Sequence, residues 1–252
     1  MPTQRWYDPA RMWYRYKPTR WLLWGFIFLA LVRVPAEAAR PFVTDDARLA
    51  TAGSCQLESW SRFYADSAEV WALPACNLGG NLEFTLGGGL ARYLDASRPG
   101  SEDYVLQAKT LFRSLETNGW GWGVAVGTVR HPRVNPGPNL FGNTYVYFPF
   151  SASFADDRVV MHLNTGWLHD KVLSRDHLTW GIGSEINTSE RLTIVAETFG
   201  DNRVDPYWQA GGRYAIIPHL FQVDATVGRQ TGADQGNRWV SFGVRFTPAS
   251  LF

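Results

Sequence analysis

Charged residues in the C-terminal third are spaced so that hairpins would bring opposite charges together. Arg213 and Asp224 lie at equal distances from a predicted turn at 218–219, which would make them cross-strand neighbours. The next hairpin would place Arg245 beside Asp224, and Glu197 could join from the preceding strand. The predicted ladder has two interpretations: it pairs charges that a narrow interior buries, or it selects among charged molecules.

The histidines and serines could form a hydrolytic site, which needs a nucleophile, a base and an orienting group. His162, near Asn164, falls within a predicted strand, and the other histidines lie in predicted loops and turns: His131, His169, His177 and His219. No serine lies in a nucleophile-elbow sequence, and the His and Asp residues of 169–177 match no metal-ligand spacing. We expect no catalytic site, no metal site and no cofactor.

The two cysteines lie at a spacing that suits a disulfide. Cys55 and Cys76 are equidistant from 65–66, where the sequence YADSAE (64–69) is a plausible turn. Cysteines that face each other across a hairpin are expected to pair in an exported protein. The alternative is two separate buried thiols.

Export is indicated by the N-terminus. An apolar run at 21–32 follows basic residues and precedes Ala36 and Ala38, which fit the small-residue cleavage rule. The run is too short to span a bilayer as a helix. We predict a signal peptide over residues 1–38, with Met1 or Met12 as the true start; the alternative is an uncleaved anchor.

The net charge gives no indication of a nucleic-acid partner. Six of the 24 basic and two of the 23 acidic residues lie in 1–38, so the remainder carries 18 basic and 21 acidic residues. The exported part therefore has a net charge of −3 and no basic stripe to neutralise phosphates.

The elements that would position these side chains are strands, because apolar residues recur with period 2 from Cys55 to Phe246. Most runs have about ten residues, the length of a tilted strand that crosses a bilayer. Short turns alternate with longer links, which is typical of an all-β, single, transmembrane, antiparallel up-and-down barrel of about 12 strands. The predicted strands are 55–64, 69–76, 82–92, 103–113, 119–129, 143–153, 159–168, 177–185, 191–199, 206–216, 220–229 and 237–246.

The two faces of the strands indicate which side meets lipid. In 82–92, Leu82, Phe84 and Leu86 share one face, and Glu83 and Thr85 share the other. The polar face is rich in Gly and Thr, whereas the water-facing side of a soluble sandwich favours Lys and Glu. A crowded lumen explains this, and its further predicted polar residues are Glu83, Lys109, His162 and Asn164.

Aromatic residues on the apolar face mark the two predicted bilayer interfaces. The sequence GWGWGVAVGTV (119–129) sends Trp120 and Trp122 outward at the periplasmic end and leaves glycines toward the lumen. The opposite belt comprises Tyr104, Trp167, Trp180 and Trp208. The alternative is that these aromatics form a soluble core.

Two segments resemble a known family. ARPFVTDDARLATAGSCQLESW, from residue 39, and LPACNLGGNLEFTLGGGL, up to residue 90, are similar to the outer-membrane barrels associated with the meta-cleavage pathway of phenol degradation, often called transporters. The resemblance implies an outer-membrane barrel and passage of hydrophobic or aromatic compounds. It implies no catalytic residues.

Together these observations predict a signal peptide (1–38), a periplasmic stretch (39–54) and an outer-membrane barrel (55–252). Residues 39–54 have a second possible placement, inside the lumen as a plug. The predicted function is a narrow channel for small, hydrophobic or aromatic molecules, with outer-membrane lipids and the barrel assembly machinery as partners. A barrel enzyme acting on lipid or peptide and a plugged structural barrel are the alternatives.

Overall fold

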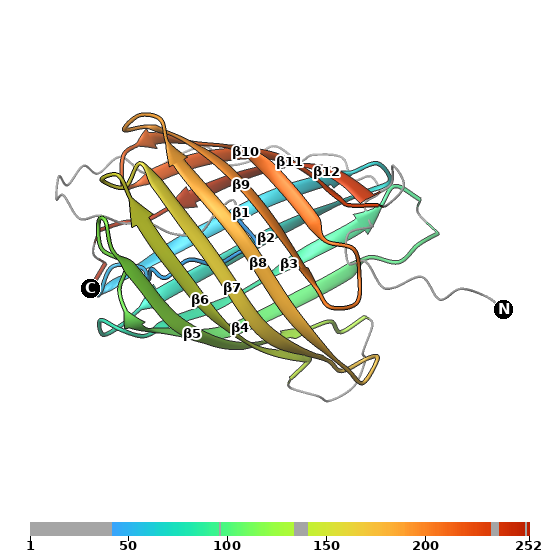
Figure 1. Ribbon diagram of the computed structural model, residues 1–252. Helices are drawn as coiled ribbons and strands as arrows, with labels where there is room; N and C mark the ends of the chain where they lie inside the picture. Colours follow the sequence, from blue (N-terminus) through green and yellow to red (C-terminus); the bar gives the residue numbers. More distant parts are fainter. Residues whose placement is uncertain (1–41, 96, 134–140, 233–236, 250) are drawn as a thin grey trace.

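The computed structural model describes residues 42–95, 97–133, 141–232, 237–249, and 251–252. Within these ranges the chain forms twelve strands that close into one antiparallel barrel, in which each strand pairs with its neighbour in sequence and β1 pairs with β12 (Figure 1). The strands are β1 (Ser54–Tyr64), β2 (Ser67–Asn77), β3 (Glu83–Tyr93), β4 (Ser101–Arg113), β5 (Trp120–Arg130), β6 (Asn143–Phe154), β7 (Val159–Asp170), β8 (Arg175–Asn187), β9 (Leu192–Asp201), β10 (Tyr207–Ile217), β11 (Phe221–Gln230) and β12 (Arg238–Phe246). Every predicted strand is confirmed, with ends that differ by at most two residues.

Closure of the barrel leaves no strand edge unpaired. The register between β1 and β12 runs from Leu57 opposite Phe246 to Tyr64 opposite Trp239. Because the side chains of a strand alternate, closure turns one whole face of each strand outward. The predicted signal peptide lies outside the described residues. Among the residues that the structure describes, no helix is long and apolar enough to cross a membrane.

The outward face is apolar, as the alternation predicted. Leu86 has 68 % of its surface exposed on the outside of β3, whereas its neighbour Thr85 is buried in the interior. Isolated apolar side chains are common on soluble proteins, but an exterior of this kind along every strand requires lipid rather than water.

The aromatic side chains of the predicted belts also lie on the outside. Trp120 stacks on Phe150 at 5.9 Å between ring centroids, and Trp122 contacts Phe112 at 4.6 Å. At the opposite end the exposed aromatic residues are Tyr104, Trp167 and Trp208, and Trp180 is half-buried.

Glycines on the inward face make room for large lumenal side chains. A Cβ at Gly89 would lie 2.4 Å from the Trp71 ring, and one at Gly127 would lie 2.4 Å from the Tyr145 hydroxyl. Such contacts are far shorter than packing allows, so these strands need glycine to face a filled lumen.

The disulfide between Cys55 and Cys76 joins β1 to β2 at opposite register positions, as the spacing predicted. The turn between the two strands is at 65–66, so the disulfide lies at the opposite, open end of this hairpin.

Candidate functional site in the barrel lumen

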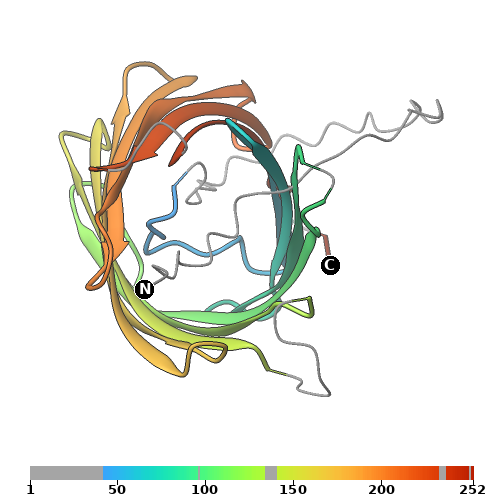
Figure 2. The same cartoon turned by 90° about the vertical axis from the view of Figure 1, so that its right-hand side faces the viewer.

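Residues 42–53, called the lumen segment below, run inside the barrel. Figure 2 shows this blue stretch of chain within the ring of strands. Thr44, Asp46, Ala47 and Ala50 each expose 3 % or less of their surface. The periplasmic placement predicted for 39–54 does not apply to this described part, which takes the second placement that the sequence left open.

Glu197 of β9 holds the beginning of the lumen segment. Its carboxylate accepts hydrogen bonds from the backbone N–H groups of Val43 (2.7 Å) and Thr44 (2.8 Å). It also accepts one from the side-chain amide of Gln209 at 2.5 Å. Glu197 was predicted to join the charge ladder, but its carboxylate is directed instead at backbone donors that have no strand partner. This satisfies buried N–H groups that would otherwise be costly.

Asp45 binds the wall formed by β4 and β6. Its carboxylate lies 2.8 Å from the ammonium of Lys109 and accepts a hydrogen bond from the Tyr147 hydroxyl at 2.7 Å. Asp46 adds a second carboxylate 3.6 Å from Lys109. The Asn164 side-chain amide, oriented to satisfy its hydrogen bonds, accepts from the Asp45 N–H at 2.6 Å and donates to the Asp45 carbonyl at 2.8 Å.

Arg48 binds the opposite wall through Glu185 of β8. The guanidinium of Arg48 lies 3.4 Å from Glu185, which is also 2.9 Å from Arg213 of β10. One buried carboxylate therefore compensates an arginine of the segment and an arginine of the wall. This sharing reduces the cost of burying three charges.

His162 and Ser151 hold the middle of the segment. The Ser151 hydroxyl accepts a hydrogen bond from the Ala47 N–H at 2.9 Å and lies 2.8 Å from Nδ1 of His162. The Phe42 ring packs edge-on against His162 at 5.5 Å between centroids. The Nε2 atom of His162 is 3.8 Å from Glu185.

Ser151, His162 and Glu185 are the residue types of a hydrolytic triad. Both Ser151 and His162 are buried, and neither lines the long-loop or the short-turn cavity described below. The arrangement fastens the lumen segment. In the described part of the chain, no group of three or more His, Cys, Asp or Glu residues could hold a metal ion.

The end of the segment is held by β2 and β3. Glu83 accepts a hydrogen bond from the Ala50 N–H at 2.6 Å, and the Asn77 amide donates to the Ala50 carbonyl at 2.7 Å. Among the polar lumen residues that the sequence predicted, Glu83, Lys109, His162 and Asn164 all contact the lumen segment. The sequence indicated their face but not their partner.

The sheet register places the residues of the predicted charge ladder relative to one another. Arg213 lies opposite Asp224, as predicted, and its guanidinium lies 2.9 Å from Glu185. Asp224 lies opposite Gly243, two register positions from Arg245, so the predicted register of this hairpin is wrong. The cause is the β11–β12 connection, whose centre a long loop does not fix. Arg245 lies opposite Gln222 and 3.9 Å from Glu58 of β1.

The barrel interior contains two cavities, and none of the described residues lines both; the lumen segment lines the first of them. The long-loop cavity, at the end with the longer connections, has a volume of about 770 Å³. Its walls carry stacked ring pairs at centroid distances of 5.8 Å (Trp60–Trp71), 6.0 Å (Tyr145–Tyr147) and 5.6 Å (Phe199–Tyr207). Asp45 and Lys109 form part of its floor.

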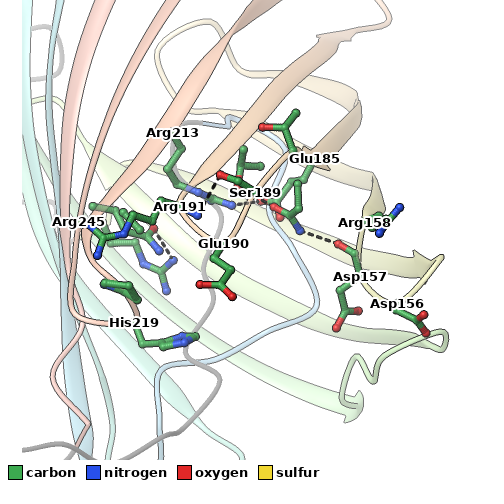
Figure 3. Close-up of a pocket in the computed structure, with 16 residues that line it drawn as sticks. Asp156, Asp157, Arg158, Glu185, Ser189, Glu190, Arg191, Arg213, His219 and Arg245 are labelled. Carbon is green, nitrogen blue, oxygen red and sulfur yellow. Dashed lines mark hydrogen bonds and ion pairs between the residues drawn. The ribbon is translucent and has the colours of Figure 1, made fainter.

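The short-turn cavity, at the opposite end, has a volume of about 710 Å³ and is highly charged. Figure 3 shows Arg191, Arg213 and Arg245 on one side of it, and Asp156 and Asp157 on the other. The long-loop cavity thus combines aromatic rings with charged side chains, whereas the short-turn cavity is lined mainly by charged and polar ones.

Comparison with models of known protein families shows to which family the chain belongs. The model of the family described as uncharacterised conserved protein UCP029691 matches residues 26–247. The chain belongs to this family. The match extends over all the strands and the lumen segment, so the plugged barrel described above is the structure of a UCP029691 member. Among curated protein sequences, none is significantly similar to the chain.

Solved structures with a similar fold are porins. The UCP029691 barrel superposes on the KdgM porin with a TM-score of 0.57 at 10% identity, covering 77% of this chain and 99% of that one. The same values apply to the KdgM porin in complex with disordered oligogalacturonate. The NanC porin gives a TM-score of 0.55 at 9% identity, covering 77% and 100%. At such identities the similarity establishes the fold, and function must be argued from the site.

Proposed function

We propose that this protein is a channel of the bacterial outer membrane through which small molecules pass, and that the lumen segment restricts the passage. The observation that carries the proposal is a pair of cavities at opposite ends of the barrel interior, with the lumen segment lining the long-loop cavity and fastened to the strands around it. The apolar exterior supports a membrane location, and the porin fold of KdgM and NanC is compatible with it. Outer-membrane lipids and the barrel assembly machinery are the partners that such a location requires.

Hydrophobic or aromatic molecules are the solutes that the long-loop cavity favours. Ring pairs on its walls offer flat apolar surfaces for stacking. Its volume of about 770 Å³ falls in the range of small-molecule sites. The sequence resemblance to barrels of phenol degradation points to the same solutes and stays a prediction.

Flux into liposomes tests the proposal. We expect the purified protein to carry small aromatic solutes slowly, and a variant lacking residues 39–48 to carry the same solutes faster. Both proteins are first shown to be folded by their heat-modifiable migration in gels. Absence of flux in both proteins would identify a structural barrel instead, and large open-pore currents from the complete protein would contradict the restricted lumen.

A further inference from the structure

The contact between Asp45 and the barrel wall has the composition of a carboxylate-binding site. Lys109 exposes 3 % of its surface, and its ammonium is held by carboxylates at 2.8 and 3.6 Å, both from the lumen segment. Tyr147 donates a hydrogen bond to the same Asp45 carboxylate. A buried ammonium needs an anionic partner, and a charged acceptor strengthens the hydroxyl hydrogen bond.

Asp45 can be reached by a molecule in the long-loop cavity. Its side chain exposes 19 % of its surface, whereas that of Asp46 exposes 1 %. Asp45, Lys109 and Tyr147 all line this cavity. Of the two carboxylates that compensate Lys109, Asp45 is thus the one that a solute could replace.

The surroundings of the site select for a ring next to the carboxylate. Tyr145 and Tyr147 are stacked at 6.0 Å with 21° between their planes, and Tyr145 donates to Gln107 at 2.9 Å. The tyrosine hydroxyls are therefore fixed by hydrogen bonds, and both residues line the cavity. Trp60 and Trp71 line the cavity as a further stacked pair.

We propose that Lys109 and Tyr147 bind the carboxylate of an aromatic acid, that Asp45 occupies this site in the absence of solute, and that the solute displaces it. The inference rests on the proposed channel function. Exchange of one carboxylate for another keeps the buried ammonium compensated, so the displacement costs little. A neutral ring of the same size cannot make this exchange. Displacement frees the part of the lumen segment that faces β4 and β6.

A spin label on the lumen segment measures the displacement directly. Val43 is half-exposed, and its backbone N–H bond to Glu197 does not involve its side chain, so Val43→Cys can carry a nitroxide. We expect benzoate to mobilise the label at a concentration about tenfold to a hundredfold lower than benzamide, the range expected for a hydrogen bond to a charged group. Acetate should need a severalfold to about tenfold higher concentration than benzoate, because it makes no ring stacking. Benzamide lacks the charge and acetate lacks the ring.

Three variants distinguish a binding site from a structural contact. Lys109→Met removes the preference for benzoate over benzamide. Tyr147→Phe keeps the lysine and weakens the response to benzoate several-fold. It replaces Lys109→Met as the test if Lys109→Met does not fold. Asp45→Asn removes the competing carboxylate, so the response to benzoate occurs at about tenfold lower concentration. A purely structural contact would give no gain in the response of Asp45→Asn.

The outcomes separate this inference from the proposed function. If liposomes carry benzamide and benzoate equally and the label responds to neither, the carboxylate site is refuted and the channel remains. If the protein and its variant lacking residues 39–48 carry no solute, the channel itself is refuted. An unchanged benzoate response in both Lys109→Met and Tyr147→Phe also refutes the site.

Discussion

Replacement of Glu197 by Gln should release the lumen segment and raise solute flux. The carboxylate accepts the N–H groups of Val43 and Thr44 with its two oxygens, at 2.7 and 2.8 Å. A glutamine has nearly the same shape but only one oxygen, and its NH₂ group would face a backbone donor. At least one charge-assisted hydrogen bond is lost, which costs about 2 kcal/mol.

This loss translates into a measurable change in flux. A free-energy change of about 2 kcal/mol raises the population of the released segment about thirtyfold, since 1.4 kcal/mol corresponds to a factor of ten. While the released state is rare, flux through the barrel rises in proportion to its population. We therefore expect initial rates of liposome uptake of a small aromatic solute to increase about thirtyfold in Glu197→Gln.

The matched control makes the same chemical change at a site without contact to the segment. Glu116 is exposed in the β4–β5 turn, and Glu116→Gln should leave the flux unchanged. Equal flux in Glu197→Gln and Glu116→Gln, with both barrels folded, would refute the reasoning that the Glu197 hydrogen bonds keep the passage closed.

Three further predictions follow from the packing of the barrel and its segment. Gly181→Val should push the lumen segment away and raise flux, because a Cβ at Gly181 would lie 2.5 Å from the Thr44 hydroxyl; a heat-modifiability assay should show that the barrel stays folded. The control is Gly79→Val, where a Cβ meets nothing within 4 Å, and equal flux in the two variants would contradict the prediction. Replacing both Cys55 and Cys76 by serine should lower the free energy of unfolding by about 3 kcal/mol relative to the oxidised wild type, the loop-entropy value for the 21-residue separation, measured by urea unfolding; the reduced wild type should match the variant, and an unchanged free energy of unfolding would contradict the prediction. Leu86→Arg should destabilise the barrel in lipid vesicles by about 2–4 kcal/mol, whereas Leu86→Gln costs less; a soluble, stable Leu86→Arg protein would exclude lipid contact at this face.

The sequence alone predicted the elements of the barrel because the information for them is local. Alternation of apolar and polar side chains along ten residues defines a strand and its two faces, as Leu86 and Thr85 illustrate. Short connections with a small number of possible centres also fixed the register of some hairpins. The pairing of Cys55 with Cys76 and that of Arg213 with Asp224 were predicted in this way.

Register across long loops and the partners of buried charges were decided by the tertiary structure. The β11–β12 connection allows several hairpin centres, and only the closed sheet places Arg245 opposite Gln222. The sequence identified Glu197 and Lys109 as lumenal, yet their partners lie more than sixty positions away in the chain, in a segment without strand periodicity. Closure of the barrel encloses that segment and limits the water that its backbone N–H groups and carboxylates can bind. The lumenal side chains become their partners because buried donors and charges must be satisfied wherever the fold brings them together.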